Sequence, residues 1–287
     1  MKRNLLTEIE AGMPSFSKGQ KLISNYILEN YDKAAYMTAS KLGNIVHVSE
    51  STVVRFAIEL GFEGYPEFQH ALQEIVRTKL TSFQRIEVTN NLIGDGDVLS
   101  KVLLADADKI KHTLEQIDRD AFEAAVESIV GAKNIYILGV RASSSLAGFL
   151  AHGLRMIFDN VKFVQTTSGS EMFEQIMSIK PEDTMIAVSF PRYSKRIIHA
   201  VNFAHNVGAD VIAITDSLAS PIASQASQVL TAKSDMASFV DSLVAPLSIV
   251  NAIIVAVSRK KQDELKIRLR QLEEIWDEYD VYDKTQG

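Results

Sequence analysis

Five short apolar runs in the second half of the chain constrain its fold more than any other feature. The runs are NIYILG, VKFVQ, TMIAVSF, DVIAIT and QVLTA, starting at residues 134, 161, 184, 210 and 228, and helical patterns separate most of them. A strand that is apolar on both faces has to be covered on both faces, as in a parallel sheet with helices on either side. The pattern therefore predicts a doubly wound parallel-sheet α/β fold.

Hydroxyl and basic side chains follow two of these strands. After the first strand come Gly139, Arg141, Ser143, Ser144 and Ser145, and after the third come Ser189, Arg192, Ser194 and Lys195. Loops at the carboxyl ends of parallel strands hold phosphate well, because helix N-termini there offer free amides and a favourable dipole. Neither loop has a G-x-G-x-x-G fingerprint or a P-loop lysine, so we predict a site for a single phosphate. The alternative is that these serines only cap helices.

The segment between residues 38 and 61 predicts two short helices. Thr38 and Ser49 are good N-caps for helices over 39–46 and 50–60. Only His47 and Val48 separate the two, which is the spacing of a helix-turn-helix within an all-α domain. His47 stands where the turn often needs a positive φ, which histidine adopts less readily than glycine.

The second of these helices is the one expected to read DNA. Val53, Phe56, Ala57 and Leu60 recur at helical spacing and form its buried face. Outward-facing side chains in its first turns are then placed to reach base edges in a major groove. The candidate DNA-binding residues are Ser40, Lys41, Ser49, Ser51, Thr52 and Arg55. Arg55 can pair with guanine, and the others are placed for phosphate or base contacts. The alternative is an ordinary helical bundle with a solvated arginine.

The length of 287 residues exceeds what one hydrophobic core usually holds. We predict a helix-turn-helix domain over 1–80, a helical linker over 81–130, and an α/β domain with a C-terminal helix over 131–287. The net charge is −6, but the residues up to Leu80 carry nine basic and nine acidic side chains. The first domain is therefore not repelled from a polyanion, although it is not strongly basic.

Composition excludes several classes of protein. The chain has no cysteine, which rules out disulfides, thiolate zinc sites and a cysteine nucleophile. No H-E-x-x-H or similar spacing predicts a metal site, and no cofactor is expected. The apolar window over 239–258 contains Asp241, Pro246 and Asn251, so we predict a core helix and no membrane partner. The N-terminus lacks a signal-peptide core, and we expect a cytoplasmic protein.

The first domain resembles a known family. The string TASKLGNIVHVSESTVVRFAIELGFEGYPEFQ is similar to the N-terminal domain of RpiR-type bacterial transcriptional regulators, with VSESTVVRF and the following Gly-Phe-x-Gly-Tyr-Pro-x-Phe segment as its characteristic parts. Gly43 and His47 stand where that pattern favours Ala and Gly. The resemblance implies that the domain binds operator DNA.

The second half resembles the SIS domain, a sugar-isomerase fold that such regulators carry and that binds phosphosugars. Gly139 and Ser143 keep the ends of the family pattern G-x-G-x-S, with Arg141 in place of the second glycine. Ser189 and Ser194 keep the ends of the pattern S-x-S-G-x-T, and Pro191 and Arg192 replace its middle residues. The segment GADVIAITDSLASPIASQASQVL also matches the family. The resemblance implies a phosphorylated sugar as effector.

Because SIS domains also occur in isomerases, the alternative function is a phosphosugar isomerase. Glu171, at a predicted helix start, is the best placed general base and also a candidate ligand contact. We nevertheless predict no catalytic residues and a regulator. Operators are usually read by symmetric dimers, so a homodimer or homotetramer is expected. The amphipathic segment 259–279 is either an oligomer contact or a helix that packs on its own sheet.

Overall fold

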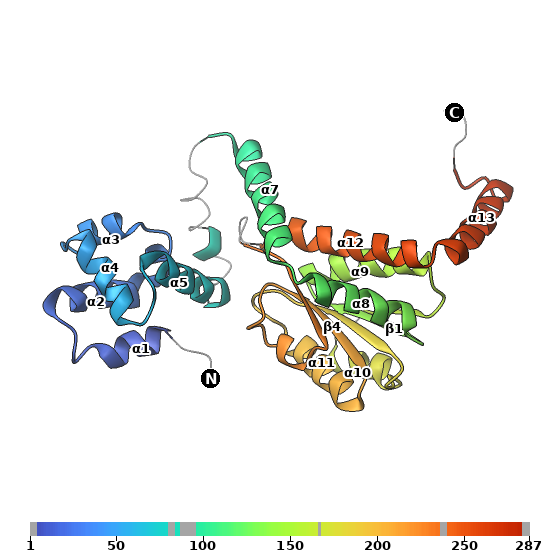
Figure 1. The fold of residues 1–287 in the computed structure, drawn as a ribbon, viewed down its shortest axis with the longest axis horizontal. Helices are drawn as coiled ribbons and strands as arrows, with labels where there is room; N and C mark the ends of the chain where they lie inside the picture. The colour runs from blue at the N-terminus through green and yellow to red at the C-terminus, as the bar shows by residue number, and fades with distance from the viewer. Residues whose placement is uncertain (1–4, 80–83, 87–95, 166–167, 236–239, 283–287) are drawn as a thin grey trace. The chain divides into compact units, whose positions relative to one another are not determined.

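The structure is a computed structural model that describes residues 5–79, 84–86, 96–165, 168–235 and 240–282. The chain divides into two compact units (Figure 1). The first unit comprises Met1–Gly96 with Met236–Val240, and the second comprises Asp97–Asp235 with Asp241–Gly287.

The described secondary-structure elements of the first unit are all helices. The longer ones are α1 (Leu5–Gly12), α2 (Lys18–Ala34), α3 (Ala39–Ile45), α4 (Glu50–Glu59) and α5 (Tyr65–Lys79). Phe56 of α4 packs edge to face against Phe16 and Phe68, with ring centroids 5.4 and 5.9 Å apart. The helical spacing of Ile23 and Ile27 behind the Ser17 cap predicts a helix that ends near Asn30. That limit is wrong, because α2 continues through a kink at Asn30 as far as the buried Ala34.

The second unit begins with two helices and continues as the predicted alternation of strands and helices. The helices are α7 (Val98–Gln116), α8 (Arg119–Gly131), α9 (Ala142–Arg155), α10 (Gly169–Ile176), α11 (Lys195–Val207), α12 (Val244–Lys260) and α13 (Gln262–Glu278). The strands are β1 (Ile135–Gly139), β2 (Val161–Val164), β3 (Thr184–Val188), β4 (Asp210–Thr215) and β5 (Gln228–Thr231). All five predicted strands are confirmed. The domain limits predicted from the sequence stay a prediction.

The strands form one parallel sheet in the order β2-β1-β3-β4-β5. The chain moves from β1 outward to β2, then returns across β1 to β3 and continues to β4 and β5. The strand order therefore reverses between β1 and β3. In the register of these two strands Gly139 pairs with Val188, so both strands end at the same level.

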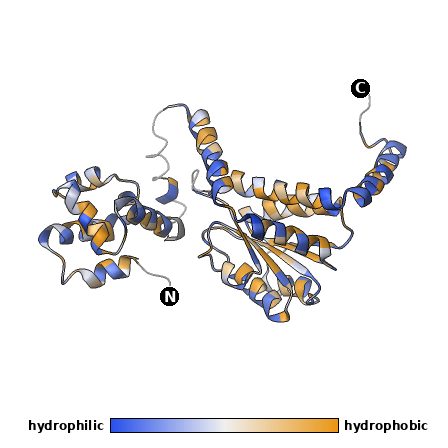
Figure 2. Cartoon of the chain, viewed as in Figure 1, coloured by the Kyte–Doolittle hydropathy of each residue, from blue (hydrophilic) through white to orange (hydrophobic). Residues whose placement is uncertain are grey.

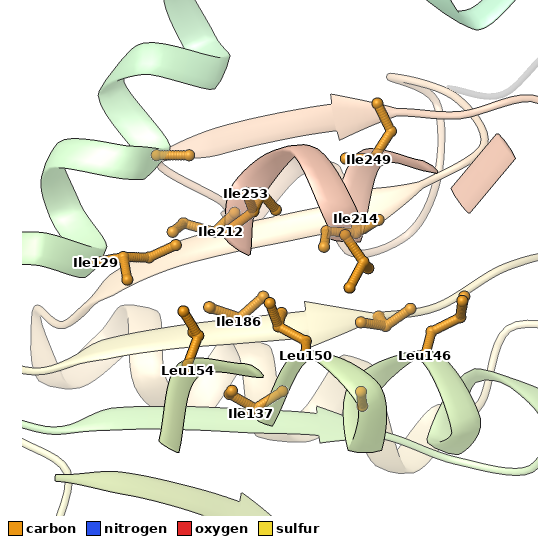
Figure 3. Close-up of a cluster of buried hydrophobic side chains, with 14 of the residues drawn as sticks. Ile129, Ile137, Leu146, Leu150, Leu154, Ile186, Ile212, Ile214, Ile249 and Ile253 are labelled. Carbon is orange, nitrogen blue, oxygen red and sulfur yellow. The ribbon is translucent and has the colours of Figure 1, made fainter. Parts of the chain in front are cut away.

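Helices cover both faces of the sheet, as the continuously apolar strands predict (Figure 1). On one face, α8, α9 and α12 bury a cluster that includes Ile129, Leu150 and Ile253 against Ile137 and Ile212 (Figure 3). On the other face, α10 and α11 bury a second cluster. The hydropathy colouring shows the same division, with apolar strands and helices that are polar on their outer sides (Figure 2).

The apolar window predicted as a core helix is α12, whose buried residues include Ile249 and Ile253. Among the described residues, no helix has the length and hydropathy needed to cross a membrane. The C-terminal helix α13 forms as predicted, but none of its residues is buried. Leu265, in its first turn, packs against the main core of the unit, and the remaining apolar side chains are half-buried or exposed.

Candidate functional sites

The turn between α3 and α4 is the tight connection that the sequence predicts. The Val48 amide donates to the Gly43 carbonyl at 2.9 Å, and His47 has a φ of 57°. A Cβ on Gly43 would lie 2.8 Å from the Val48 carbonyl oxygen. Glycine at position 43 therefore lets the turn approach α3, while His47 accepts the left-handed backbone that glycine would adopt without strain.

Both helices of the motif begin with the predicted caps. The Thr38 hydroxyl accepts from the Lys41 amide at 3.2 Å, and the Ser49 hydroxyl accepts from the Thr52 amide at 3.3 Å. Each cap satisfies an amide that the helix itself cannot pair. Ser40 and Lys41 are exposed in the first turn of α3, as expected for phosphate contacts.

The structure gathers the other candidate DNA-binding residues at the start of α4. The Ser49 hydroxyl lies 2.9 Å from that of Ser51 and 2.8 Å from that of Thr52. Arg55 is exposed and its Nε donates to the Ser51 carbonyl at 3.2 Å, which orients the guanidinium along the same side of the helix. Thr52 projects less than expected: it is half-buried, with its methyl group beside Gly19 of α2.

The loop after β1 is tightly folded against the start of α9. Gly139 ends the strand, and a Cβ there would lie 2.5 Å from the Ser143 carbonyl oxygen and 3.1 Å from Cβ of Ala147. Arg141, exposed, has φ 57° and ψ −128°, a combination that glycine adopts far more readily than other residues. Ser143 is 9% exposed, Ser144 is half-buried and Ser145 is exposed.

The loop after β3 combines a buried beginning with exposed basic residues. Ser189 is 4% exposed, and its amide donates to the Ile214 carbonyl at 3.0 Å, which continues the β3–β4 ladder. Arg192, with φ 56°, and Lys195 are exposed, and Ser194 is half-buried. The two loops are neighbours because β1 and β3 are paired and end at the same level.

Capping does not account for the serines of these loops. The helices that begin after β1, β2 and β3 are α9, α10 and α11, and none has an N-cap side chain that accepts a hydrogen bond. By contrast, Ser17, Thr38, Ser49, Asp97 and Asp118 all cap their helices in this way. In the part of the chain that the structure describes, the hydroxyls of Ser143, Ser189 and Ser194 make no hydrogen bond to another residue. Hydroxyls and first-turn amides are thus left for a ligand.

The position of the loops is the one where open α/β sheets bind ligands. The β1–β3 pair is the topological switch point, with α9 on one face of the sheet and α11 on the other. Helices that leave in opposite directions open a crevice beyond the carboxyl ends of the strands. The structure therefore brings both predicted loops to one edge, and the unpaired hydroxyls with two helix N-termini suit an anion of the size of a phosphate.

The candidate acid and base residues lie on three different helices, α9, α10 and α11. Glu171 is exposed in the first turn of α10, at the carboxyl end of β2. His152, His199 and His205 are exposed on α9 and α11. Among the described residues, no group of three or more histidine, aspartate or glutamate side chains could hold a metal ion.

Sequence reasoning missed one interaction at this edge. The Tyr193 hydroxyl, in the loop after β3, donates to Oδ1 of Asp216 at 2.7 Å. Asp216 is buried directly after β4 and also accepts from the Thr215 hydroxyl at 3.2 Å. This contact ties the second serine loop to the next strand. An aspartate directly after a buried strand is the sequence signal that could have indicated it.

A helix-turn-helix unit joined in one chain to a doubly wound unit with a ligand edge defines a two-domain regulator of the helix-turn-helix class. Comparison with known families supports both parts. Residues 3–79 match the helix-turn-helix domain of the rpiR family, and residues 128–256 match the SIS domain. The chain belongs to the RpiR family of transcriptional regulators.

Two relatives match this chain along most of their own length. An uncharacterized HTH-type transcriptional regulator of Haemophilus influenzae is 28% identical over 79% of both chains. HexR of Escherichia coli, an HTH-type transcriptional regulator, is 21% identical over 94% of this chain and 93% of its own.

Two solved structures are similar in fold. The sugar isomerase domain of an RpiR transcription factor from Sphaerobacter thermophilus is 30% identical, covers 61% of this chain and 97% of its own, and has a TM-score of 0.59. Vibrio vulnificus NanR complexed with ManNAc-6P is 25% identical, covers 96% of this chain and 99% of its own, and has a TM-score of 0.60.

Proposed function

We propose that this chain is an operator-binding transcriptional regulator whose SIS domain binds a phosphorylated sugar, and that binding changes its affinity for DNA. The observation that carries the proposal is the set of unpaired hydroxyls at the β1–β3 switch point, beside two uncapped helix N-termini. The NanR complex with ManNAc-6P supports a phosphosugar as the ligand class. The relatives named as transcriptional regulators support a regulator over an isomerase.

Within this proposal, the phosphate binds between the loops after β1 and β3. The candidate contacts are Gly139, Arg141, Ser143, Ser144, Ser145, Ser189, Arg192, Ser194, Lys195 and Glu171. Buried Ser143 and Ser189 form the floor of the site, and Ser194 lies at the start of α11. Amides at the N-termini of α9 and α11 complete the coordination of a dianion.

The ligand test uses the intact protein and a panel of phosphorylated sugars. A ligand that binds the native state raises the melting temperature in proportion to its occupancy and affinity. The combined substitutions Ser143→Ala and Ser194→Ala should remove that increase. The control is Ser258→Ala, because the Ser258 hydroxyl donates within α12, to the Val255 carbonyl, and lies outside both loops. An unchanged increase in the double variant would place the ligand elsewhere. Turnover of a phosphosugar that is lost in Glu171→Gln would favour the isomerase instead.

The DNA test addresses the start of α4. We propose that Arg55 reads a base and that Ser40, Lys41, Ser49, Ser51 and Thr52 hold the phosphate backbone or neighbouring base edges. Arg55→Ala should lower affinity for a selected DNA site by about tenfold or more, and affinity for random DNA far less. Lys33→Ala removes one exposed positive charge at the end of α2 and serves as the control. Equal loss on both kinds of DNA would reduce Arg55 to a phosphate contact.

We further propose that the regulator is a cytoplasmic homodimer or homotetramer. Two-fold symmetric operators require two recognition helices at a fixed spacing. Candidate contacts are the half-buried or exposed apolar side chains of α13 and the more than half-exposed apolar side chains of α7, which are Val98, Leu99, Leu103, Leu104 and Leu114. Ligand binding would alter the packing of the protomers and hence that spacing, with about 1 to 3 kcal/mol of coupling between the two sites.

A further inference from the structure

The C-terminal helix α13 leaves its apolar face outside the core of its own unit. The helix has 17 residues, of which none is buried, and it turns away from the sheet at the end of α12 (Figure 1). Among the described residues, the main core cluster of the unit includes Leu265 of α13 and no other residue of this helix. Most of the stability of a helix in a protein comes from packing of its apolar face. The face of α13 therefore lacks the packing that a helix of this kind needs.

The apolar side chains of α13 form one continuous stripe. Its members follow one another at intervals of four, three, four and three residues, and they are Leu265, Leu269, Leu272, Trp276 and Tyr279. These intervals are those of the a and d positions of a coiled coil, where side chains of one helix fit between side chains of another. Tyr279, at the end of the stripe, is 71% exposed. The stripe is therefore suited to pack against a second helix.

Contacts near both ends hold α13 in place. Near its start, Nη1 of Arg268 lies 2.5 Å from Oδ1 of Asp159. Near its end, the ring of Trp276 packs edge to face against that of Tyr282, with centroids 5.3 Å apart. The middle of the stripe, over residues 269–272, belongs to neither core cluster of the unit. The helix is thus held in position while the centre of its apolar stripe stays outside the core.

The charges of α13 are divided between a basic half and an acidic half. The basic residues of segment 265–270 are Lys266, Arg268 and Arg270, and the acidic residues of segment 271–279 are Glu273, Glu274, Asp277 and Glu278. Neither segment contains a residue of the opposite charge. A helix favours acidic residues at its N-terminus and basic residues at its C-terminus. Asp263 and Glu264 in the first turn follow this preference, but Asp277 and Glu278 in the last turn oppose it. The acidic end of α13 is therefore suited to a basic neighbour.

We infer that α13 pairs with α13 of a second copy of this chain, and that the two helices run antiparallel. Antiparallel pairing brings the basic half of each helix against the acidic half of the other and opposes the two helix dipoles. Parallel pairing would place the two acidic halves side by side. This inference rests on the proposed homo-oligomer and names the surface that forms it.

The stripe and the charges together set the register of the pair. In an antiparallel pair an a position of one helix faces a d position of the other, so Leu269 faces Leu272 of the second copy. Lys266 then lies beside Glu273 of the second copy, because both flank the stripe on the same side. Within its own helix Lys266 lies 3.9 Å from Asp263, and both side chains are exposed. Such an exposed pair contributes little, so it does not compete strongly with a pair between the two copies.

The orientation can be tested by cross-linking, because the chain has no cysteine and every reactive thiol is an introduced one. Gln262 and Glu278 are exposed at the two ends of α13. They lie about 24 Å apart along the helix, which a short bismaleimide cannot span within one chain. We expect the full-length double variant Gln262→Cys with Glu278→Cys to be cross-linked into dimers. Each single variant should stay uncross-linked, since antiparallel pairing separates identical ends.

The other outcomes of this experiment contradict the inference. Cross-linking of Gln262→Cys alone would show a parallel pair, and no cross-linking of the double variant would show that α13 does not pair. Sedimentation velocity of the same samples separates these results from a failure of the proposed homo-oligomer. A dimer without cross-links would assemble through another surface, whereas a monomer would refute the homo-oligomer as well.

Variants of the stripe assign the contact to its side chains. Leu272→Asp, added to the double-cysteine variant, should abolish the cross-link because it places a carboxylate in the centre of the seam. Ile267→Asp is the matched control, since Ile267 is 61% exposed and lies on the side of α13 opposite the stripe. It should keep the cross-link. Equal loss in both variants would overturn the assignment.

A charge exchange tests the register. Lys266→Glu should weaken dimer formation about tenfold, because it replaces two attractions in the symmetric pair with two repulsions. Adding Glu273→Lys should restore dimer formation, since it returns opposite charges to the same places. It cannot restore the pair between residues 263 and 266 within one helix. Dimer formation that stays weak in the exchanged variant would contradict the register.

Discussion

Replacing Gly139 with alanine should destabilise the second unit and distort the first ligand loop. The added Cβ would lie 2.5 Å from the carbonyl oxygen and 2.8 Å from the carbonyl carbon of Ser143, and 3.1 Å from Cβ of Ala147. Two of these three atoms belong to the backbone of α9, so no rotation of a side chain can make room. Either β1 or the start of α9 has to move.

The loss in the free energy of unfolding depends on which atoms have to move to accept the added methyl group. Overpacking a well-packed core costs about 1 to 3 kcal/mol, and we expect the upper end of that range because backbone has to shift. Gly153→Ala, further along α9, is the matched control. Its Cβ would lie 2.5, 2.9 and 3.2 Å from Cδ1, Cγ1 and Cγ2 of Ile254, so the atoms that have to move belong to one side chain and not to backbone. Alanine gains about 1 kcal/mol over glycine within a helix. That gain offsets the cost of moving the Ile254 side chain, so the control should stay within about 1 kcal/mol of the wild type.

The assay is denaturation by urea, followed by far-ultraviolet circular dichroism of the full-length protein and both variants. A midpoint for Gly139→Ala equal to that of the wild type would refute the steric argument. A loss in Gly153→Ala as large as in Gly139→Ala would also refute it, because it would show that any methyl group added to α9 is harmful. The thermal shift caused by phosphosugar should fall in Gly139→Ala and remain in Gly153→Ala.

Three further changes test single contacts. Ser49→Ala removes the cap of α4 and should cost about 1 kcal/mol, measured by urea denaturation of the wild type and the variant. Burial raises the pKa of Tyr65 to about 12, above its ordinary value. The free energy of unfolding is therefore not affected by this group below about pH 10. It falls as the pH rises from 10 toward 12, because the Tyr65 hydroxyl loses its proton in the unfolded chain before it does so in the folded one. Tyr65→Phe should remove this part of the alkaline decline in the melting temperature. Lys109 is 9% exposed and pairs with Asp106 at 3.1 Å. Lys109→Met should lower the free energy of unfolding by about 2 kcal/mol, which is less than the loss on breaking a fully buried ion pair. Lys111 is exposed, and Lys111→Met should leave the free energy of unfolding nearly unchanged in the same denaturation assay.

The sequence predicts the elements well where one physical signal dominates. The five apolar runs indicated strands, of which β1 and β3 are buried throughout, and Thr38 and Ser49 marked the helix starts of the first unit. The end of α2 was missed because buried contacts of Ala34 and Ala35 carry the helix past the unfavourable Asn30. No local pattern near Asn30 reports such a contact.

The ligand edge was only partly predictable. Both loops could be identified as hydroxyl-rich, but whether β1 and β3 are neighbours depends on the order of strands in the sheet. Ser49 and Ser194 both stand at helix starts, but the Ser49 side chain caps α4 and the Ser194 side chain does not cap α11. The difference lies in the path of the backbone, which a single residue type does not determine. The bond between Tyr193 and Asp216 joins different loops, so the place of Asp216 after a buried strand indicates the aspartate but not its partner.

The central claim is that phosphosugar binding and operator binding are coupled in one protein. The most direct measurement is the dissociation constant for a selected DNA site, by fluorescence anisotropy, without phosphosugar and with a saturating concentration of one that binds. The two constants should differ by about 5- to 150-fold, and DNA should change the affinity for the sugar by the same factor. Identical constants, with sugar binding verified in the same samples, would contradict the account.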